Sequence, residues 1–260
     1  MTIRANAIFA AACATLVAMP TLAAQGSAAP RTILAIGAHA GDIELTAGQV
    51  LLAQHDKGDR IVILEMTLGE GGNPKLTPEQ YGAQKKREAQ AVASVLGAEV
   101  LFAPYRDGEI PNTEEARRYV ADVIRQVKPS LVITHWKNSM HRDHANTSAI
   151  VQDAVLLASL EGVKTEHPAW RGVRGVWYAE NWEDPDDFHP YVYVSTAGAV
   201  QRWKDAVSNY EFARGTTSGF PYIDYYTALA TVRGSEARTG QAEAFDIDSW
   251  GKKRVLQSVP

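Results

Sequence analysis

Hydrophobic and polar positions follow two alternating patterns along most of the chain. Short runs rich in Ile and Val, such as "TILAI" at 32–36 and "RIVIL" at 60–64, predict buried β-strands. Segments with apolar residues at helical spacing follow most of these runs. The predicted strands are Thr32–Ala38, Arg60–Met66, Glu99–Ala103, Ser130–Thr134, Gly175–Ala179 and Tyr191–Val194. The predicted helices are Glu44–Asp56, Pro78–Leu96, Thr113–Val127, Asn146–Leu160, Ala197–Phe212 and about Pro221–Ser235.

This alternation predicts an α/β fold, with a mainly parallel, Rossmann-like sheet and helices on both faces. Residues at the predicted helix ends agree with it. Gly97 follows one helix, Pro129 follows another, and Asn112 or Thr113 can cap the helix between them. The sequence contains no repeat and no linker between positions 25 and 260, so a single domain is expected there.

The first 24 residues have the three-part pattern of a secretory signal peptide. Arg4 precedes an apolar run at Ala7–Met19, and small residues follow with cleavage expected after Ala23 or Ala24. An uncleaved anchor is disfavoured because the run is shorter than the ~20 residues of a membrane span. We therefore expect a periplasmic or secreted protein without a stable membrane span after cleavage.

The only cysteine, Cys13, lies inside this segment. A lipid-attachment cysteine is the alternative, but the Ala10–Ala12 run before it lacks the usual branched residue. The mature chain is expected to have no disulfide and to depend on its core for stability.

Composition narrows the class of partner. The chain of 260 residues is 45% hydrophobic and 22% charged, which is typical of a globular protein. Its net charge of -4 provides no basic field for a polyanion, so no nucleic-acid partner is expected.

Histidines and acids collect at the ends of two predicted strands. His39 and Asp42 follow the first strand in "GAHAGDIELTAG". The segment "THWKNSMHRDHANT" follows the fourth strand and contains His135, His141, Asp143 and His144. The first and fourth strands of a doubly wound sheet can be neighbours where the strand order reverses, which would bring the two clusters together. Two imidazoles and one carboxylate suit a catalytic Zn²⁺ that activates water, although other divalent metals tolerate the same donors.

Several segments in order resemble the PIG-L/LmbE family of zinc-dependent N-deacetylases. "GAHAGDIELTAG" is similar to the family's A-H-P-D-D-x-E-L-x-x-G motif, and "HRDH" to its H-x-D-H motif. "TLGEGG", "KREAQAVASVLGAEVLF", "RDGEI" and "RGSEARTGQAEAF" resemble further family segments, so that the resemblance extends from about Ile33 to Phe245. It implies an LmbE-like fold, one Zn²⁺ ion and removal of an N-acetyl group from an amino sugar.

Matching the motifs position by position implies roles for single residues. His39, Asp42 and His144 correspond to the three metal ligands. His141 corresponds to the catalytic histidine that steadies the oxyanion or protonates the amine, and we expect Asp143 to orient it. Glu70, Arg87 and Asp107 correspond to positions that border the substrate pocket.

The first motif departs from the family at one position. The acid that acts as general base is replaced by Gly41, and the proline before it by Ala40. In the first reading the enzyme uses another base, for which Glu44, Glu70, Asp143 and His141 are available. In the second the protein binds a sugar or a metal without hydrolysis. In the third the pocket serves another metal-assisted hydrolysis. We favour the first because the metal set is complete.

Other interpretations have less support. A nucleotide-binding protein is disfavoured because the Gly-containing turns match neither the G-x-G-x-x-G nor the P-loop spacing. Nucleophilic catalysis by a Ser/His/Asp triad is unsupported because no G-x-S-x-G occurs. The acidic segment "ENWEDPDDFHP" at 180–190 is expected to be a solvated loop rather than a calcium site. Export favours a small or oligomeric amino-sugar substrate from the envelope or the environment. Aromatic residues near Tyr222–Tyr226 could stack on it, although core packing is favoured for them.

Overall fold

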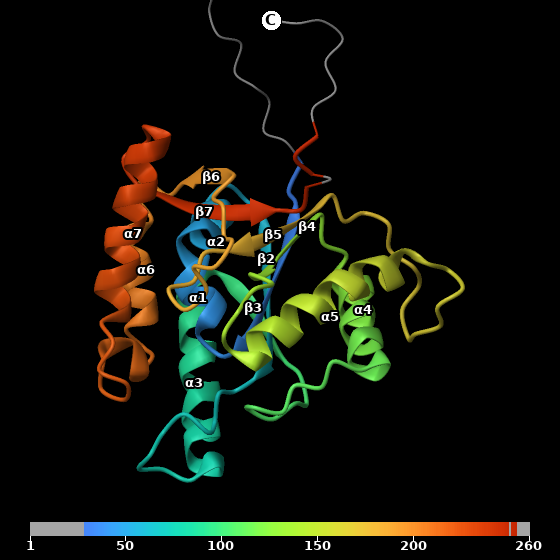
Figure 1. Cartoon of the computed structure of the whole chain (residues 1–260), viewed down its shortest axis with the longest axis horizontal. Coiled ribbons are helices and arrows are strands. Elements are labelled where there is room, and N and C mark those ends of the chain that lie inside the picture. Colours follow the sequence, from blue (N-terminus) through green and yellow to red (C-terminus); the bar gives the residue numbers. More distant parts are fainter. Residues whose placement is uncertain (1–28, 250, 254–260) are drawn as a thin grey trace, which may run out of the picture.

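A computed structural model describes residues 29–249 and 251–253, which build one seven-stranded sheet with helices on both faces (Figure 1). The strands are β1 (Thr32–His39), β2 (Arg60–Thr67), β3 (Ala98–Phe102), β4 (Leu131–His135), β5 (Gly175–Ala179), β6 (Val192–Ser195) and β7 (Ala242–Ile247). The helices are α1 (Asp42–Thr46), α2 (Gly48–His55), α3 (Pro78–Leu96), α4 (Glu114–Val127), α5 (Arg142–Ser159), α6 (Val200–Val207) and α7 (Tyr222–Ala237), with a short 3₁₀ turn at Phe212–Arg214.

The strand order is β3-β2-β1-β4-β5-β7-β6, so the predicted neighbourhood of the first and fourth strands is confirmed. The strands from β3 to β5 pair in parallel, with Ile36 of β1 beside Thr134 of β4. The carboxyl ends of β1, β4 and β5 therefore meet at one edge of the sheet, where an α/β fold places its site.

The alternation of side chains along the strands divides the core into two layers. Ile33 and Ala35 of β1 face a cluster that includes residues of α2, α3, α6 and α7. Leu34 and Ile36 face the opposite cluster, which α4 and α5 cover. Strands buried on both faces explain the continuous apolar runs of the sequence.

Four elements differ from the prediction, and one of them is the fifth predicted helix, since α6 spans Val200–Val207 rather than Ala197–Phe212. The first helix is broken at Ala47, which separates α1 from α2. Helix α5 begins at Arg142 rather than at Asn146, because His141 caps its first turn. Strand β7 was missed, and it pairs antiparallel with β5 and β6.

No helix within the described residues is long and apolar enough to cross a membrane. The predicted signal peptide at 1–24, with Cys13, lies outside the part of the chain that the structure describes.

Candidate metal centre and its pocket

The turn after β1 is held from both neighbouring strands. The N–H of Ala40 donates to the carbonyl of Thr67 at the end of β2 (3.1 Å). The N–H of Ala38 donates to Nε2 of His135 at the end of β4 (2.8 Å). Gly41 adopts a φ of 108°, a left-handed value that favours glycine. The turn is thereby fixed so that His39 and Asp42 face the same space.

His39 and His144 approach one oxygen of Asp42. Oδ2 of Asp42 lies 3.0 Å from Nδ1 of His39 and 3.2 Å from Nε2 of His144. Ligand atoms about 2.1 Å from a tetrahedral zinc lie about 3.4 Å from one another, so each imidazole is near ligand spacing from Asp42. Ligand atoms of two overlapping sets, His39 with His141 and His144, and Asp42 with His135 and His144, each lie within 4.8 Å of one another. The structure thus brings the three predicted ligands together, although their role as ligands stays a prediction.

Electrostatics of this cluster favour positive charge. Burial alone would lower the pKa of His144, but Asp42 and Asp184 outweigh it and raise that pKa to about 9. Burial is likewise outweighed at His39, where Asp42, Asp107 and Asp143 hold the pKa well above its usual value. Burial would raise the pKa of Asp42, but the two imidazoles hold it well below its usual range. The same acids that favour protons on the histidines would also favour a divalent cation in their place. The charge of the donor set therefore suits a metal.

His135 lies behind this cluster and has a different role. Its ring stacks on that of His144 with centroids 4.1 Å apart. Burial and the neighbouring His144 lower its pKa to about 4, so it is neutral near pH 7. Its Nε2 accepts the Ala38 N–H, which leaves that nitrogen occupied by the turn. His135 therefore supports His144 and the turn from below.

His141 caps α5 and lines the pocket above the candidate ligands. Its Nδ1 accepts the N–H of Asp143 at 3.2 Å, so the ring proton is on Nε2 when the ring is neutral. Burial and the neighbouring His144 and His39 lower its pKa. Neutral His141 can thus donate a hydrogen bond into the pocket.

The carboxylate of Asp143 has partners other than the one expected. It accepts N–H groups from Gly108 (2.7 Å) and Ile110 (3.3 Å), and Oδ2 lies 3.4 Å from Nε2 of His39. The prediction that Asp143 orients His141 is therefore wrong for its side chain, because the carboxylate holds the loop at 108–110 and His39.

The three residues predicted to border the substrate divide into three cases. Asp107 lines the pocket, with Oδ1 3.1 Å from Nε2 of His39. Glu70 supports it from behind, because its Oε1 accepts the Asp107 N–H at 3.0 Å. Arg87 is exposed on α3, so the structure contradicts its predicted place beside the substrate. Lys85, two residues earlier on the same helix, lines the pocket instead.

Position 41 is closed by residues that sequence reasoning missed. A Cβ added to Gly41 would lie 2.6 Å from Cζ of Phe212 and 3.4 Å from Cε2 of Tyr210. Nζ of Lys85 donates to the Ala40 carbonyl and lies 3.8 Å from the centre of the Phe212 ring. Burial lowers the pKa of Lys85 to about 8 against the pull of nearby acids. The space beside the missing acid is therefore filled by an aromatic ring.

The acidic segment after β5 is part of the site, which corrects its interpretation as a solvated loop. Asp184 is 1% exposed, and its Oδ2 lies 3.7 Å from Nδ1 of His144 and accepts from Asn181 (3.2 Å). The Tyr226 hydroxyl donates to Asn181 at 2.8 Å. Glu183 lines the pocket, and burial raises its pKa. Only the later acids of the loop, Asp186 and Asp187, are exposed as expected.

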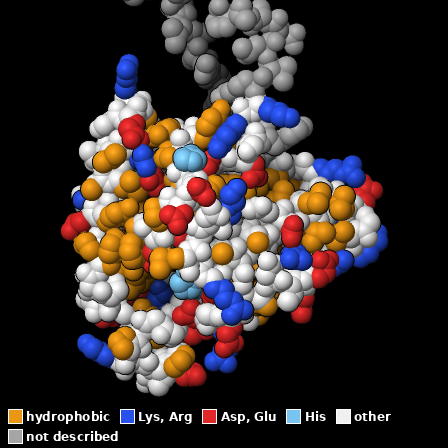
Figure 2. All heavy atoms as spheres, in the orientation of Figure 1, with side chains coloured by type: hydrophobic (Ala, Val, Ile, Leu, Met, Phe, Trp, Pro, Cys, Tyr) orange, Lys and Arg blue, Asp and Glu red, His pale blue; other side chains and the backbone are white. Residues whose placement is uncertain are grey.

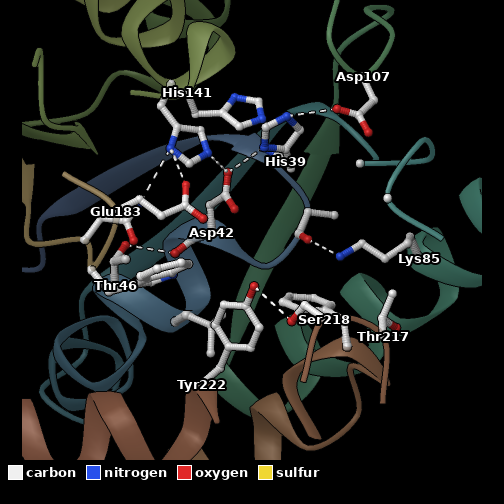
Figure 3. Close-up of a pocket in the computed structure, with 18 of the residues that line it drawn as sticks. His39, Asp42, Thr46, Lys85, Asp107, His141, Glu183, Thr217, Ser218 and Tyr222 are labelled. Carbon is white, nitrogen blue, oxygen red and sulfur yellow. Dashed lines mark hydrogen bonds and ion pairs between the residues drawn. The ribbon is translucent and has the colours of Figure 1, made fainter. Parts of the chain in front are cut away.

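His39, Asp42, His141, His144 and Glu183 border one pocket of about 220 Å³ (Figure 3). In the space-filling view, hydrophobic side chains, a histidine and acids gather around a hollow on this face (Figure 2). Trp182, Tyr222 and Tyr226 are among its aromatic lining, so the rings near Tyr222–Tyr226 serve the pocket as well as the core. The signal that could have found this wall is the position of "ENWED", which directly follows a strand at the same edge of the sheet.

The comparisons with known proteins agree with this arrangement. Residues 34–155 match the PIG-L family, described as GlcNAc-PI de-N-acetylase. This part of the chain is thus similar to the PIG-L family. The matched range contains every candidate ligand, His141 and Asp143, but ends before the loop that follows β5. The PIG-L motifs therefore cover one side of the pocket only.

Proteins similar to this chain have two kinds of activity in their names. It is 27% identical to a 4-oxalmesaconate hydratase from Pseudomonas putida, over 80% of this chain and 81% of that protein. It is 25% identical to a 1D-myo-inositol 2-acetamido-2-deoxy-alpha-D-glucopyranoside deacetylase from Rhodococcus erythropolis, over 62% of this chain and 70% of that protein. Proteins similar to this chain thus include a deacetylase and a hydratase.

Solved structures show the fold. A 4-carboxy-2-hydroxymuconate hydratase from Pseudomonas putida has a TM-score of 0.78 at 22% identity, over 88% of this chain and 100% of the other. N,N'-diacetylchitobiose deacetylase from Pyrococcus horikoshii has a TM-score of 0.72 at 18% identity, over 84% of each chain. The LmbE-like α/β fold predicted from the sequence is confirmed.

Proposed function

We propose that this protein is a metal-dependent N-deacetylase that hydrolyses the acetamide of a neutral amino sugar or related glycan. The observation that carries the proposal is the convergence of His39, Asp42 and His144 at one point of a pocket that His141 also lines. We infer that the metal is zinc, because two imidazoles and a carboxylate leave a coordination position open for catalysis. A metal at this site would lower the pKa of a water molecule and polarise the amide carbonyl.

The side chains of the chain supply the remaining functions. Neutral His141, with its proton on Nε2, would donate to the oxygen of the amide as negative charge develops there. This hydrogen bond supports oxyanion stabilisation rather than protonation of the amine, since the pKa of His141 is lowered. Asp184 and Asn181 would hold His144 in the orientation that turns Nε2 to the metal.

Charges on the pocket wall support a neutral substrate. Asp42, Asp107 and Glu183 line it, and Lys85, the one Lys or Arg among its described lining residues, is committed to the Ala40 carbonyl. A substrate with several carboxylates would meet these acids without a free Lys or Arg to pair with. Aromatic rings on the opposite wall offer apolar faces to a sugar.

A second candidate is hydration of an unsaturated carboxylic acid. The Pseudomonas putida hydratase matches 80% of this chain, and the acid that serves deacetylases of the family is replaced by Gly41. Addition of water to an activated double bond can use the same metal site without an amide.

Acetate release tests the proposal. Purified protein loaded with zinc is incubated with N-acetylated mono- and oligosaccharides, before and after chelation, while loss of dienoate absorbance reports hydration in a parallel assay. We expect acetate from at least one sugar, loss after chelation, and return with zinc. Hydration without acetate release would favour the second candidate, and sugar binding without either product would favour a binding protein.

We also propose that the protein acts outside the cytoplasm, because residues 1–24 have the pattern of a cleaved signal peptide. Expression of the full chain with a C-terminal tag, fractionation and N-terminal sequencing test this. A first residue after Ala23 or Ala24 in the exported fraction is expected, and an intact chain in the cytoplasm would contradict it.

A further inference from the structure

We propose that Glu183, from the loop after β5, takes the proton of the attacking water in place of the acid that is missing at position 41. The inference rests on the proposed function and assigns a further catalytic residue to it. It follows from the geometry of the pocket acids, since one of these carboxylates accepts no hydrogen bond among the described residues.

The space next to Gly41 has no room for another side chain that could accept the proton. The Phe212 ring occupies the space into which a side chain would extend, and the backbone has a positive φ. Lys85 and Tyr210 pack around this ring. Phe212 therefore fills the place of the missing acid. A residue that accepts the proton has to come from another wall of the pocket.

The other carboxylates are engaged. Glu44 is fully buried beneath the turn and accepts from the Gly41 N–H (3.0 Å) and the Tyr210 hydroxyl (2.6 Å). Asp143 is buried and holds the loop at 108–110.

Two more acids are engaged on the side of Asp107. Asp107 accepts the Gly71 N–H and faces Nε2 of His39, on the side of that ring away from Asp42. Glu70 accepts from Asp107 and does not line the pocket. Neither carboxylate is free to receive a proton from water beside Asp42.

Glu183 has the opposite environment. Its side chain is 23% exposed, lines the pocket, and points into it on the side of Asp42 (Figure 3). Its Oε2 lies 4.0 Å from Nδ1 of His144, and among the described residues its carboxylate accepts no hydrogen bond. The adjacent Asp184 is buried against His144, which fixes the backbone that presents Glu183. A carboxylate with free lone pairs thus lies next to the candidate ligands.

The step balances with water as the only co-reactant. The water oxygen forms a bond to the amide carbon while one water proton passes to Glu183, and the carbonyl electron pair moves to its oxygen, where His141 donates a hydrogen bond. Glu183 then returns the proton to the nitrogen. The carbon–nitrogen bond breaks, the carbonyl re-forms, and acetic acid and the amine leave. The remaining water proton then passes from the acid to the amine, which gives acetate and an ammonium ion. One carboxylate thereby serves as base and then as acid.

Glu183→Gln tests the assignment with Asp186→Asn as its matched control. Asp186 lies in the same loop, is exposed, and is outside the pocket lining, while its carbonyl still accepts from Trp136 after substitution. We expect Glu183→Gln to lower kcat by about 10²–10³-fold, since a positioned base contributes about that much. Asp186→Asn should stay within about twofold of wild type, as expected of an exposed residue.

Two further readouts separate catalysis from structure. Glu183→Gln should keep one metal per chain. Its affinity for the amine product, measured by calorimetry, should stay within about threefold of wild type, because Glu183 contacts no candidate ligand atom and accepts no hydrogen bond that holds the fold. Retention of more than about a third of the wild-type kcat, or an equal loss of metal, would overturn the assignment.

The proposed function and the inference fail in different ways. If wild type releases no acetate but hydrates the unsaturated acid, the proposed function is wrong, and Glu183 is judged by the same ratio of kcat values in hydration. If wild type does neither while its metal site is filled, both are wrong.

Discussion

The turn after β1 and the loop after β5 reach the same pocket from either side of β4, but they hold their carboxylates differently. In the turn, Asp42 lies between two imidazoles, and Glu44 is buried and accepts hydrogen bonds. In the loop, buried Asp184 lies 3.7 Å from Nδ1 of His144, while Glu183 lies 4.0 Å from the same nitrogen and accepts no hydrogen bond among the described residues. A site that lacks an acid in its motif can therefore carry one on a segment outside that motif.

The largest expected effect comes from restoring the acid in the turn. Gly41→Asp should lower the free energy of unfolding by about 3 kcal/mol, because its Cβ meets Phe212 and its backbone is left-handed. Chemical denaturation measures this change. In a Phe212→Ala background the same substitution should cost about half as much, which a double-mutant cycle determines.

Gly58→Asp is the control for backbone strain alone. Gly58 has a φ of 93° and no atom within 4 Å of an added Cβ. Its substitution should cost about 1 kcal/mol. Equal costs at positions 41 and 58 would show that Phe212 does not close the site.

The second prediction concerns the support beneath both regions. His135 has a folded pKa of about 4, below its unfolded value of 6.5, so its contribution to stability is present above pH 6.5 and is lost as the pH falls towards 4. Between pH 7 and 4.5, metal-free wild type should lose about 2 kcal/mol more than His135→Gln. Denaturation curves at the two pH values measure this. Parallel losses would contradict the assignment of a neutral, buried His135.

The third prediction separates the two acids of the loop. Asp184→Asn should weaken zinc binding about tenfold, because the carboxylate behind His144 no longer orients it. Glu183→Gln is the comparison and should leave zinc affinity unchanged. Competition with a fluorescent chelator gives both values, and equal affinities for the two variants would remove the distinction between them.

The smallest expected effect concerns Arg87 on α3, whose predicted place beside the substrate the structure contradicts. Arg87→Gln should change kcat/KM by less than about twofold, since Arg87 is exposed away from the pocket. Lys85→Met should lower it more, because the Ala40 carbonyl loses its donor. Steady-state kinetics on one sugar substrate compares the two. A larger loss at Arg87 would restore the original prediction.

The part of the site that follows strand order could be predicted from the sequence. Parallel strands present their carboxyl ends at one edge, so the apolar runs before His39 and His135 were enough to bring the two histidine clusters together. Strand β7 was missed because its "AEAFDI" is short and carries two acids. Its pairing with β5 is a tertiary contact that local pattern does not encode.

The opposite wall could not be predicted because it depends on contacts between distant segments. Phe212 meets Gly41 across the fold, and Tyr226 reaches Asn181 from α7. Lys85 and Arg87 lie on one helix, and only the packing of α3 decides which of them faces the pocket. The matched family range ends at residue 155, so it does not include Asn181, Phe212 or Tyr226.

The central claim is that His39, Asp42 and His144 hold one divalent ion, and metal analysis tests it most directly. Wild type and Asp42→Ala are purified without a metal-binding tag, incubated with zinc, dialysed, and measured by elemental mass spectrometry. The account predicts one zinc per wild-type chain and none retained by the variant. Zinc retained equally by both proteins, or by neither, would contradict it.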